Sequence, residues 1–178
     1  MSGESIKFIG LNLEKNGALG LLLTSGVIVA AITQPLIGSI SDRLNLRIGK
    51  RLPFILISGI GTSISLITIY FANSFYFLIG SWILIQFFAN LGEGPANALL
   101  KDHVHESKFG SVSGKFNFLR VAGALVALIG SLQFMNLYDN SENKMFFLFA
   151  IIYLISLTLL STFWSFITLK NQHNLNSS

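Results

Sequence analysis

The sequence contains no cysteine and only three prolines, and charged residues make up just 11% of its 178 residues. Without cysteine, the chain can form no disulfide, perform no thiol chemistry and offer no cysteine ligand to a metal. A soluble domain has about 25% charged residues. A chain with so few charges, in which 52% of the residues are hydrophobic, cannot cover a water-facing surface. These scarcities exclude a soluble domain and predict an all-α integral membrane protein in contact with the lipid bilayer.

The signals of several other classes are also missing. No secretory signal peptide is apparent, because the first apolar run begins near Asn16 and ends in a basic segment rather than at a cleavage site. There is no nucleophile–base pattern, Walker-type phosphate loop or metalloprotease signature, so we expect neither an enzyme nor a cofactor. The net charge of +4 resides in short loops, where membrane topology explains it, and does not indicate nucleic-acid binding.

Five apolar runs are each long enough to cross a bilayer, for which about 20 helical residues suffice. They predict transmembrane helices at residues 17–41, 53–72, 75–100, 116–137 and 145–169. Residues 1–169 would form one bundle, which begins with a loop or interfacial segment over residues 1–16. Polar loops are expected over residues 101–115 and 139–144, and a polar, disordered tail over residues 170–178.

The basic residues predict the orientation of these helices. Eight of them lie on one predicted side and only Lys7, Lys15 and Lys144 on the other; the eight are Arg43, Arg47, Lys50, Arg51, Lys101, Lys108, Lys115 and Lys170. Because cytosolic loops are enriched in Lys and Arg, the C-terminus is predicted to be cytosolic and the N-terminus outside, in the plasma membrane. An odd number of spans without a signal peptide predicts that a helix precedes them or that Met1 is not the natural start.

Polar residues follow one face of the predicted helix at 75–100. Gln86, Asn90, Glu93 and Asn97 recur at spacings of three and four, and in lipid such a stripe must face the bundle interior or an aqueous cavity. The helix at 17–41 carries a comparable row of small or polar residues, namely Gly26, Ala30, Gln34, Gly38 and Asp42. We expect this row to pack on protein or to line water.

Glu93 and Arg120 are charges within predicted spans. Helical rise places both roughly 7–11 Å from the cytosolic boundary, so they can meet. With Asp42 they would form a cytosolic gate or an ion-coupling network. The alternative is that Arg120 extends to lipid phosphates and Glu93 lies in a wet vestibule.

His103 and His105 occupy alternate positions of a loop, which rarely converge on a metal, so we expect no metal site.

The stretch from Gly38 to Phe54 resembles the signature of the major facilitator superfamily between its second and third helices. The run QPLIGSISDR followed by GKRLPF is similar to the glycoside–pentoside–hexuronide and sucrose-type symporter branch. A second segment, NLGEGPANALLKDHVHESKFGSVSG, resembles the end of that branch's fourth helix and the following loop. The resemblance implies that the five spans correspond to helices 2 to 6 of an N-terminal six-helix bundle, so that the first helix and the second half of the transporter are absent.

The resemblance further implies secondary active transport of a small polar solute, a sugar or glycoside, by alternating access. The cytosolic gate motif would comprise Gly38, Asp42, Arg43, Arg47, Gly49, Lys50, Arg51 and Pro53. Gln34, Gln86 and Asn90 would line the substrate cavity. The first span lacks the embedded acid of cation-coupled members, so Glu93 is the candidate for proton-coupled symport. The chain would be inactive without the missing half or another chain. The alternative is a five-span scaffold or assembly subunit without transport activity.

Overall fold

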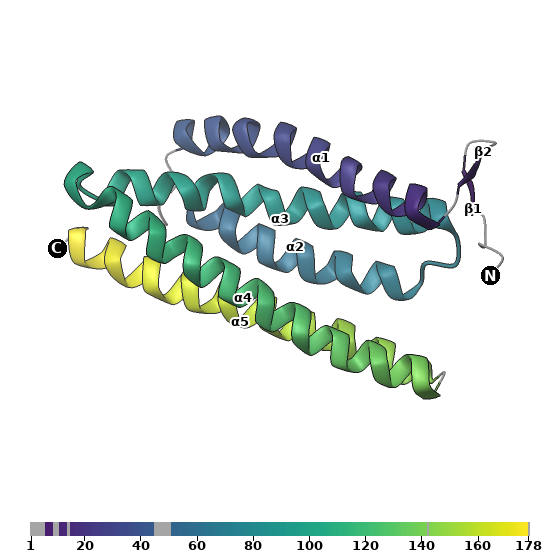
Figure 1. The fold of residues 1–178 in the computed structure, drawn as a ribbon. Coiled ribbons are helices and arrows are strands. Elements are labelled where there is room, and N and C mark those ends of the chain that lie inside the picture. The colour runs from purple at the N-terminus through teal and green to yellow at the C-terminus, as the bar shows by residue number, and fades with distance from the viewer. Residues whose placement is uncertain (1–5, 9–10, 14, 45–50, 142, 178) are drawn as a thin grey trace.

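The computed structural model describes residues 6–8, 11–13, 15–44, 51–141 and 143–177. The described residues form five helices and a small strand pair (Figure 1). The elements are β1 (Ile6–Phe8), β2 (Leu11–Leu13), α1 (Lys15–Arg43), α2 (Leu52–Tyr70), α3 (Phe75–His103), α4 (Glu106–Ser141) and α5 (Lys144–Ser177). All five helices are long and apolar enough to cross a membrane, which confirms the predicted all-α membrane bundle.

Several predicted boundaries are wrong where polar residues extend a helix. The loop expected over 101–115 is reduced to the turn between His103 and Glu106. His105 favours the start of α4, because its Nδ1 accepts a hydrogen bond of 3.4 Å from the backbone N–H of Ser107. Helix α5 likewise continues to Ser177, so the tail predicted to be disordered is helical. Hydropathy indicates only the apolar part of a helix. It therefore could not predict the polar turns at the ends of these helices.

The segment before α1 was predicted to be a loop or interfacial segment, but its described parts form two strands. Strands β1 and β2 pair antiparallel, with Ile6 opposite Leu13 and Phe8 opposite Leu11. Two strands of three residues are too short to be stable alone. The pair lies at the end of the bundle where α1 begins (Figure 1).

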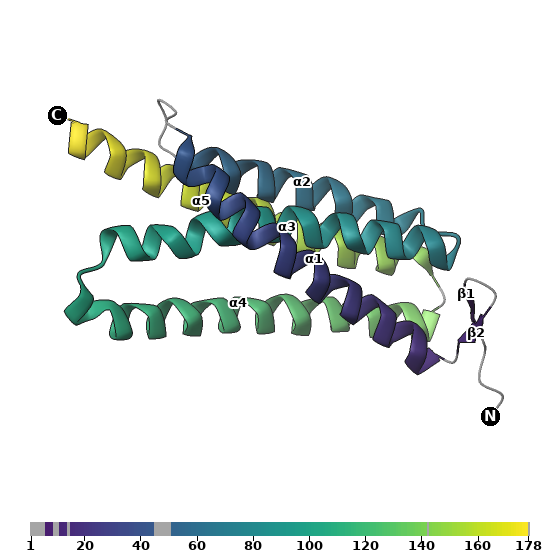
Figure 2. The ribbon, with the colours of Figure 1, turned by 90° about the horizontal axis from the view of Figure 1, so that it is seen from above.

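The helices pack in an order that differs from their order in the chain. Helix α1 packs on α3, α3 on α2, α2 on α5, and α5 on α4. This order forms an open arc whose two ends are α1 and α4. Figure 2 shows α1 crossing in front of α3, and α4 lying apart from α3 along most of its length. Large apolar side chains are exposed along all five helices, and α4 has no buried residue among those described. In a bilayer these surfaces face lipid or further protein.

Small residues set the close helix contacts inside the arc. Gly61 of α2 faces the ring of Phe88 so closely that a Cβ at this position would collide with it. Gly59 of α2 lies in the same way against Thr162 of α5. Without a hydrophobic driving force between helices in lipid, such close van der Waals contact is a main source of helix association. The small residues of α2 therefore serve packing.

Candidate functional site

The polar residues of α1 and α3 form a continuous chain of hydrogen bonds. Gln34 on α1 donates from Nε2 to Asn90 Oδ1 at 2.7 Å and to Glu93 Oε2 at 3.1 Å. Asn90 donates from Nδ2 to the backbone carbonyl of Gln86 at 2.7 Å and to Gln86 Oε1 at 3.2 Å. The three residues proposed for the substrate cavity thus lie together, and the chain that they form ends at Glu93.

Glu93 and Arg120 form an ion pair between α3 and α4. Arg120 Nη2 lies 2.5 Å from Glu93 Oε1, and the two side chains are 54% and 26% exposed, respectively. These are the two residues that helical rise predicts to lie at one depth. The pair connects α4, one end of the helix arc, to α3, on which α1 packs. The charged end of the polar chain is therefore its most accessible part.

Asp42 belongs to a different cluster from the one expected. Within the described residues, Asp42 Oδ1 pairs with Arg51 Nη2 at 3.0 Å and not with Arg120. Arg51 also donates from Nη1 to the backbone carbonyl of Pro95 at 3.3 Å. The three-residue network predicted for Asp42, Glu93 and Arg120 is therefore divided, because the guanidinium of Arg51 at the start of α2 pairs with Asp42 at the end of α1.

Arg51 is the buried member of the proposed gate motif, with 8% of its surface exposed. Arg43 is exposed, and Pro53 lies in the first turn of α2, where its missing N–H costs nothing. At Gly38 an added Cβ would meet nothing within 4 Å. Arg47, Gly49 and Lys50 lie outside the described residues. The described motif therefore connects α1, α2 and α3 through Arg51.

Two further contacts hold α1 against α3, and sequence reasoning did not single out their residues. A Cβ at Gly94 would lie 2.8 Å from the backbone carbonyl oxygen of Gln34, so the two helix backbones touch there. Trp82 donates from Nε1 to the backbone carbonyl of Leu22 at 2.7 Å. The available signal was the small residue Gly94 on the polar face of a span, since glycine at such a position permits close approach.

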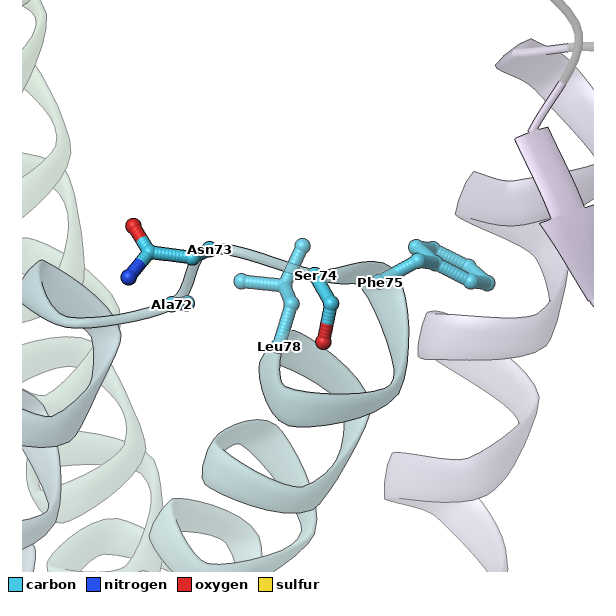
Figure 3. A pocket seen from close by; sticks show the side chains of 5 residues that line it. All are labelled: Ala72, Asn73, Ser74, Phe75 and Leu78. Carbon is cyan, nitrogen blue, oxygen red and sulfur yellow. The ribbon is translucent and has the colours of Figure 1, made fainter.

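A shallow hollow lies at the turn between α2 and α3, lined by Ala72, Asn73, Ser74, Phe75 and Leu78. Figure 3 shows Asn73 and Phe75 pointing to opposite sides of this turn. Ser74 accepts a hydrogen bond from the backbone N–H of Phe77 and so caps α3. The hollow is lined by neutral residues of one turn and lies far from the end of the bundle that holds Arg51. It is a feature of the turn and not the candidate site.

The comparison with protein families decides what kind of protein carries this site. A family model described as MFS/sugar transport protein matches residues 11–178. The chain belongs to this family. No significant match is found among curated proteins or among solved structures.

As a member of the MFS/sugar transport protein family, the chain is an integral membrane protein with a transporter-type function. The family consists of transporters and not enzymes, and its members act on a small solute. The polar chain from Gln86 to Arg120 accordingly lies in a protein whose relatives move polar molecules through a bilayer. Its position on spans that are otherwise apolar makes it the candidate solute site of this family member.

Proposed function

We propose that the chain forms part of the solute-binding bundle of a secondary active transporter, which moves a sugar or similar neutral polyol by alternating access. The observation that carries this proposal is the partly exposed Glu93–Arg120 pair within otherwise apolar spans. A charge in a membrane span is costly unless it is paired, and it marks a solute or ion path by default. The family match supports the same assignment.

The chemistry of the pair suits hydroxyl groups. An ionised carboxylate only accepts hydrogen bonds, whereas a guanidinium only donates them. Neighbouring hydroxyls of a sugar can donate to Glu93 and accept from Arg120 at the same time. Both interactions involve a charged group and are therefore stronger than neutral ones. The motif QPLIGSISDR with GKRLPF supports the glycoside–pentoside–hexuronide and sucrose-type branch, and hence a sugar or glycoside as solute.

Glu93 is also the proposed proton carrier for symport. It is a carboxylate within a predicted span that contacts both a cation and an amide donor. Intramembrane acids of this kind serve as proton relays in transporters.

At the cytosolic end, the proposed gate is the Asp42–Arg51–Pro95 cluster, which fixes the end of α1 to α3.

The bundle is proposed to function with further helices from the second half of a transporter or from another chain. The reason lies in α4, which has no buried residue among those described and carries Arg120 with 54% of its side chain exposed. Lipid would leave this guanidinium poorly solvated, whereas a protein or aqueous surface would solvate it. We therefore expect no uptake by vesicles that contain only this polypeptide, and uptake by such vesicles would contradict this dependence on a partner.

Solute binding tests the proposal directly. The purified chain in lipid nanodiscs is titrated with sucrose, melibiose and maltose, and tryptophan fluorescence or isothermal calorimetry reports binding. Glu93→Gln and Arg120→Gln are expected to weaken binding at least tenfold, whereas Lys108→Gln, at an exposed position outside the proposed site, leaves it unchanged. Equal binding by all of these variants, or no binding of any sugar by the folded chain, would overturn the proposed role of the pair.

A five-span scaffold without a solute is the second candidate. The burial of Asn90, which is only 5% exposed, favours it, since a scaffold needs its polar residues satisfied inside the bundle. Because the chain has no cysteine, single cysteines at Gln86, Asn90 and Glu93 can be tested for labelling from water without background. A scaffold predicts no labelling at any of the three, whereas a solute path predicts labelling at Glu93.

A further inference from the structure

The amide groups of Gln34 on α1 and Asn90 on α3 have no hydrogen-bond donor left for a solute. A side-chain amide nitrogen has two N–H donors. Both donors of Gln34 are used, one toward Asn90 and one toward Glu93. Both donors of Asn90 are also used, one toward the backbone carbonyl of Gln86 and one toward the side-chain oxygen of the same residue. Any solute that took a donor from either amide would break a hydrogen bond within the protein.

The charge on Glu93 determines the direction of this chain of amides. Because an ionised carboxylate only accepts, the Gln34 amide must present its nitrogen to Glu93. The same nitrogen also donates to Asn90, which must therefore accept this hydrogen bond with its side-chain oxygen. The nitrogen of Asn90 is left to donate to Gln86. One negative charge therefore orients two amides in sequence, and in return they hold the carboxylate in place.

Burial distinguishes Asn90 from the ion pair. Asn90 is 5% exposed, whereas Gln34 is half-buried, as Glu93 is. The side chains of Glu93 and Arg120 are 26% and 54% exposed. A guanidinium has five N–H donors, so Arg120 has donors to spare beyond the one directed at Glu93. Among Gln34, Asn90, Glu93 and Arg120, the donors left for a solute are therefore those of Arg120.

We propose that Gln34 and Asn90 are positioning residues, which hold Glu93 in place for Arg120 and do not contact the solute. This inference rests on the proposed function of the Glu93–Arg120 pair in solute binding. It narrows the substrate cavity predicted from the sequence, which included both amides. Gln34 lies on α1 and donates to the Glu93 carboxylate on α3. The geometry of the Glu93–Arg120 pair therefore also depends on how α1 packs against α3.

A set of mutant cycles without any solute tests the positioning role. Glu93→Gln, Arg120→Gln and the double variant are made in the native background and with Gln34→Met, which keeps the side-chain length but has no donors. Unfolding midpoints in detergent give the coupling between positions 93 and 120 in each background. We expect Gln34→Met to reduce this coupling by at least half. Gln133→Met, at an exposed glutamine of α4, is the matched control and leaves it unchanged.

A merely structural role for Gln34 would lower all midpoints equally and leave the coupling unchanged, which would overturn the proposal. If Gln34→Met gives no folded chain, Gln34→Asn keeps the donors on a shorter side chain and is expected to give an intermediate coupling; a coupling equal to the native one would again overturn it. The failure of the proposed function is distinguishable. A chain that binds no sucrose, melibiose or maltose but shows Gln34-dependent coupling contradicts solute binding alone.

Discussion

Arg51 illustrates at the residue scale why position matters more than charge. It is one of the basic residues that predict the topology, yet the structure buries it to 8% exposure between Asp42 and the backbone carbonyl of Pro95. A planar guanidinium can donate in two directions from two nitrogens, and a lysine ammonium on a flexible stem cannot reproduce that fork. Arg51 is therefore a structural link of the proposed gate.

Substitution of this guanidinium provides the first prediction. Arg51→Lys keeps the charge but loses one of the two directed bonds, and we expect it to lower the free energy of unfolding by about 1–2 kcal/mol. Arg43→Lys, at the exposed neighbouring position, is the control and should change nothing measurable. Denaturant titration of both variants in the same detergent gives the comparison. Equal effects at the two positions would show that Arg51 acts only as a charge.

Gly94 provides a second prediction at this scale. A Cβ at this position would lie 2.8 Å from the backbone carbonyl oxygen of Gln34, and a backbone atom cannot turn away as a side chain can. Gly94→Ala should therefore separate α1 from α3 and destabilise the bundle by about 1–3 kcal/mol. At Gly123 nothing lies within 4 Å, so Gly123→Ala should leave the unfolding midpoint unchanged or raise it. Two equal midpoints would contradict the close backbone contact.

At the scale of the element, α4 is the least supported helix. Its contact with α5 includes a hydrogen bond of 3.0 Å from the hydroxyl of Tyr153 to the backbone carbonyl of Val126. The ring of Tyr153 also lies so close to Gly130 that a Cβ there would collide with it. The remaining polar link of α4 among the described residues is the Arg120–Glu93 pair. Tyr153 therefore links α4 to α5 by both a hydrogen bond and close packing.

Removal of one hydroxyl tests this link. Tyr153→Phe is expected to cost about 0.5–1.5 kcal/mol, since it leaves the ring in place but deletes the bond to α4. Tyr138→Phe is the matched control, because its hydroxyl makes no such bond in the described part of the chain. Thermal unfolding of both variants, followed by circular dichroism, gives the difference. A larger loss for Tyr138→Phe would contradict the assigned contact.

The number and type of the helices could be predicted from the sequence, but their ends and partners could not. Five apolar runs sufficed for five spans, because hydropathy reports directly on the cost of burying polar groups in lipid. The polar turns at 106–115 and 170–177 are helical although they carry no hydropathy signal. The polar face of α3 predicted that Gln86, Asn90 and Glu93 lie together, since helical spacing determines a face.

Contacts between distant segments were harder to predict. Helical rise could place Glu93 and Arg120 at one depth, but it could not show that Arg51 would pair with Asp42. That outcome depends on where α2 begins relative to the end of α1. Nor could spacing show that the donors of Gln34 and Asn90 are used within the protein. Such facts depend on which side chains face each other across helices.

At the scale of the whole molecule, the orientation in the bilayer is the testable quantity. The end of α1 and the start of α4 lie at one end of the bundle, and the turn between α2 and α3 lies at the other (Figure 1). Single cysteines at Ser107 and Asn73, both exposed, therefore sample opposite sides. With a membrane-impermeant maleimide added to intact cells, we expect labelling at Asn73 and none at Ser107 until the cells are permeabilised. The reverse pattern would contradict the topology predicted from the basic residues.

The order of the arc has a consequence for how the protein is made. Translation delivers α1 to the membrane first, but its packing partner α3 follows only after α2, and Gln34 precedes Asn90 by 56 residues. Until α3 is inserted, the amide of Gln34 therefore lacks its hydrogen-bond partners Asn90 and Glu93. Helix α4 is likewise released before its packing partner α5. Some helices of the protein thus pack on partners that are synthesised later. If synthesis stopped before α3, α1 would lack its packing partner.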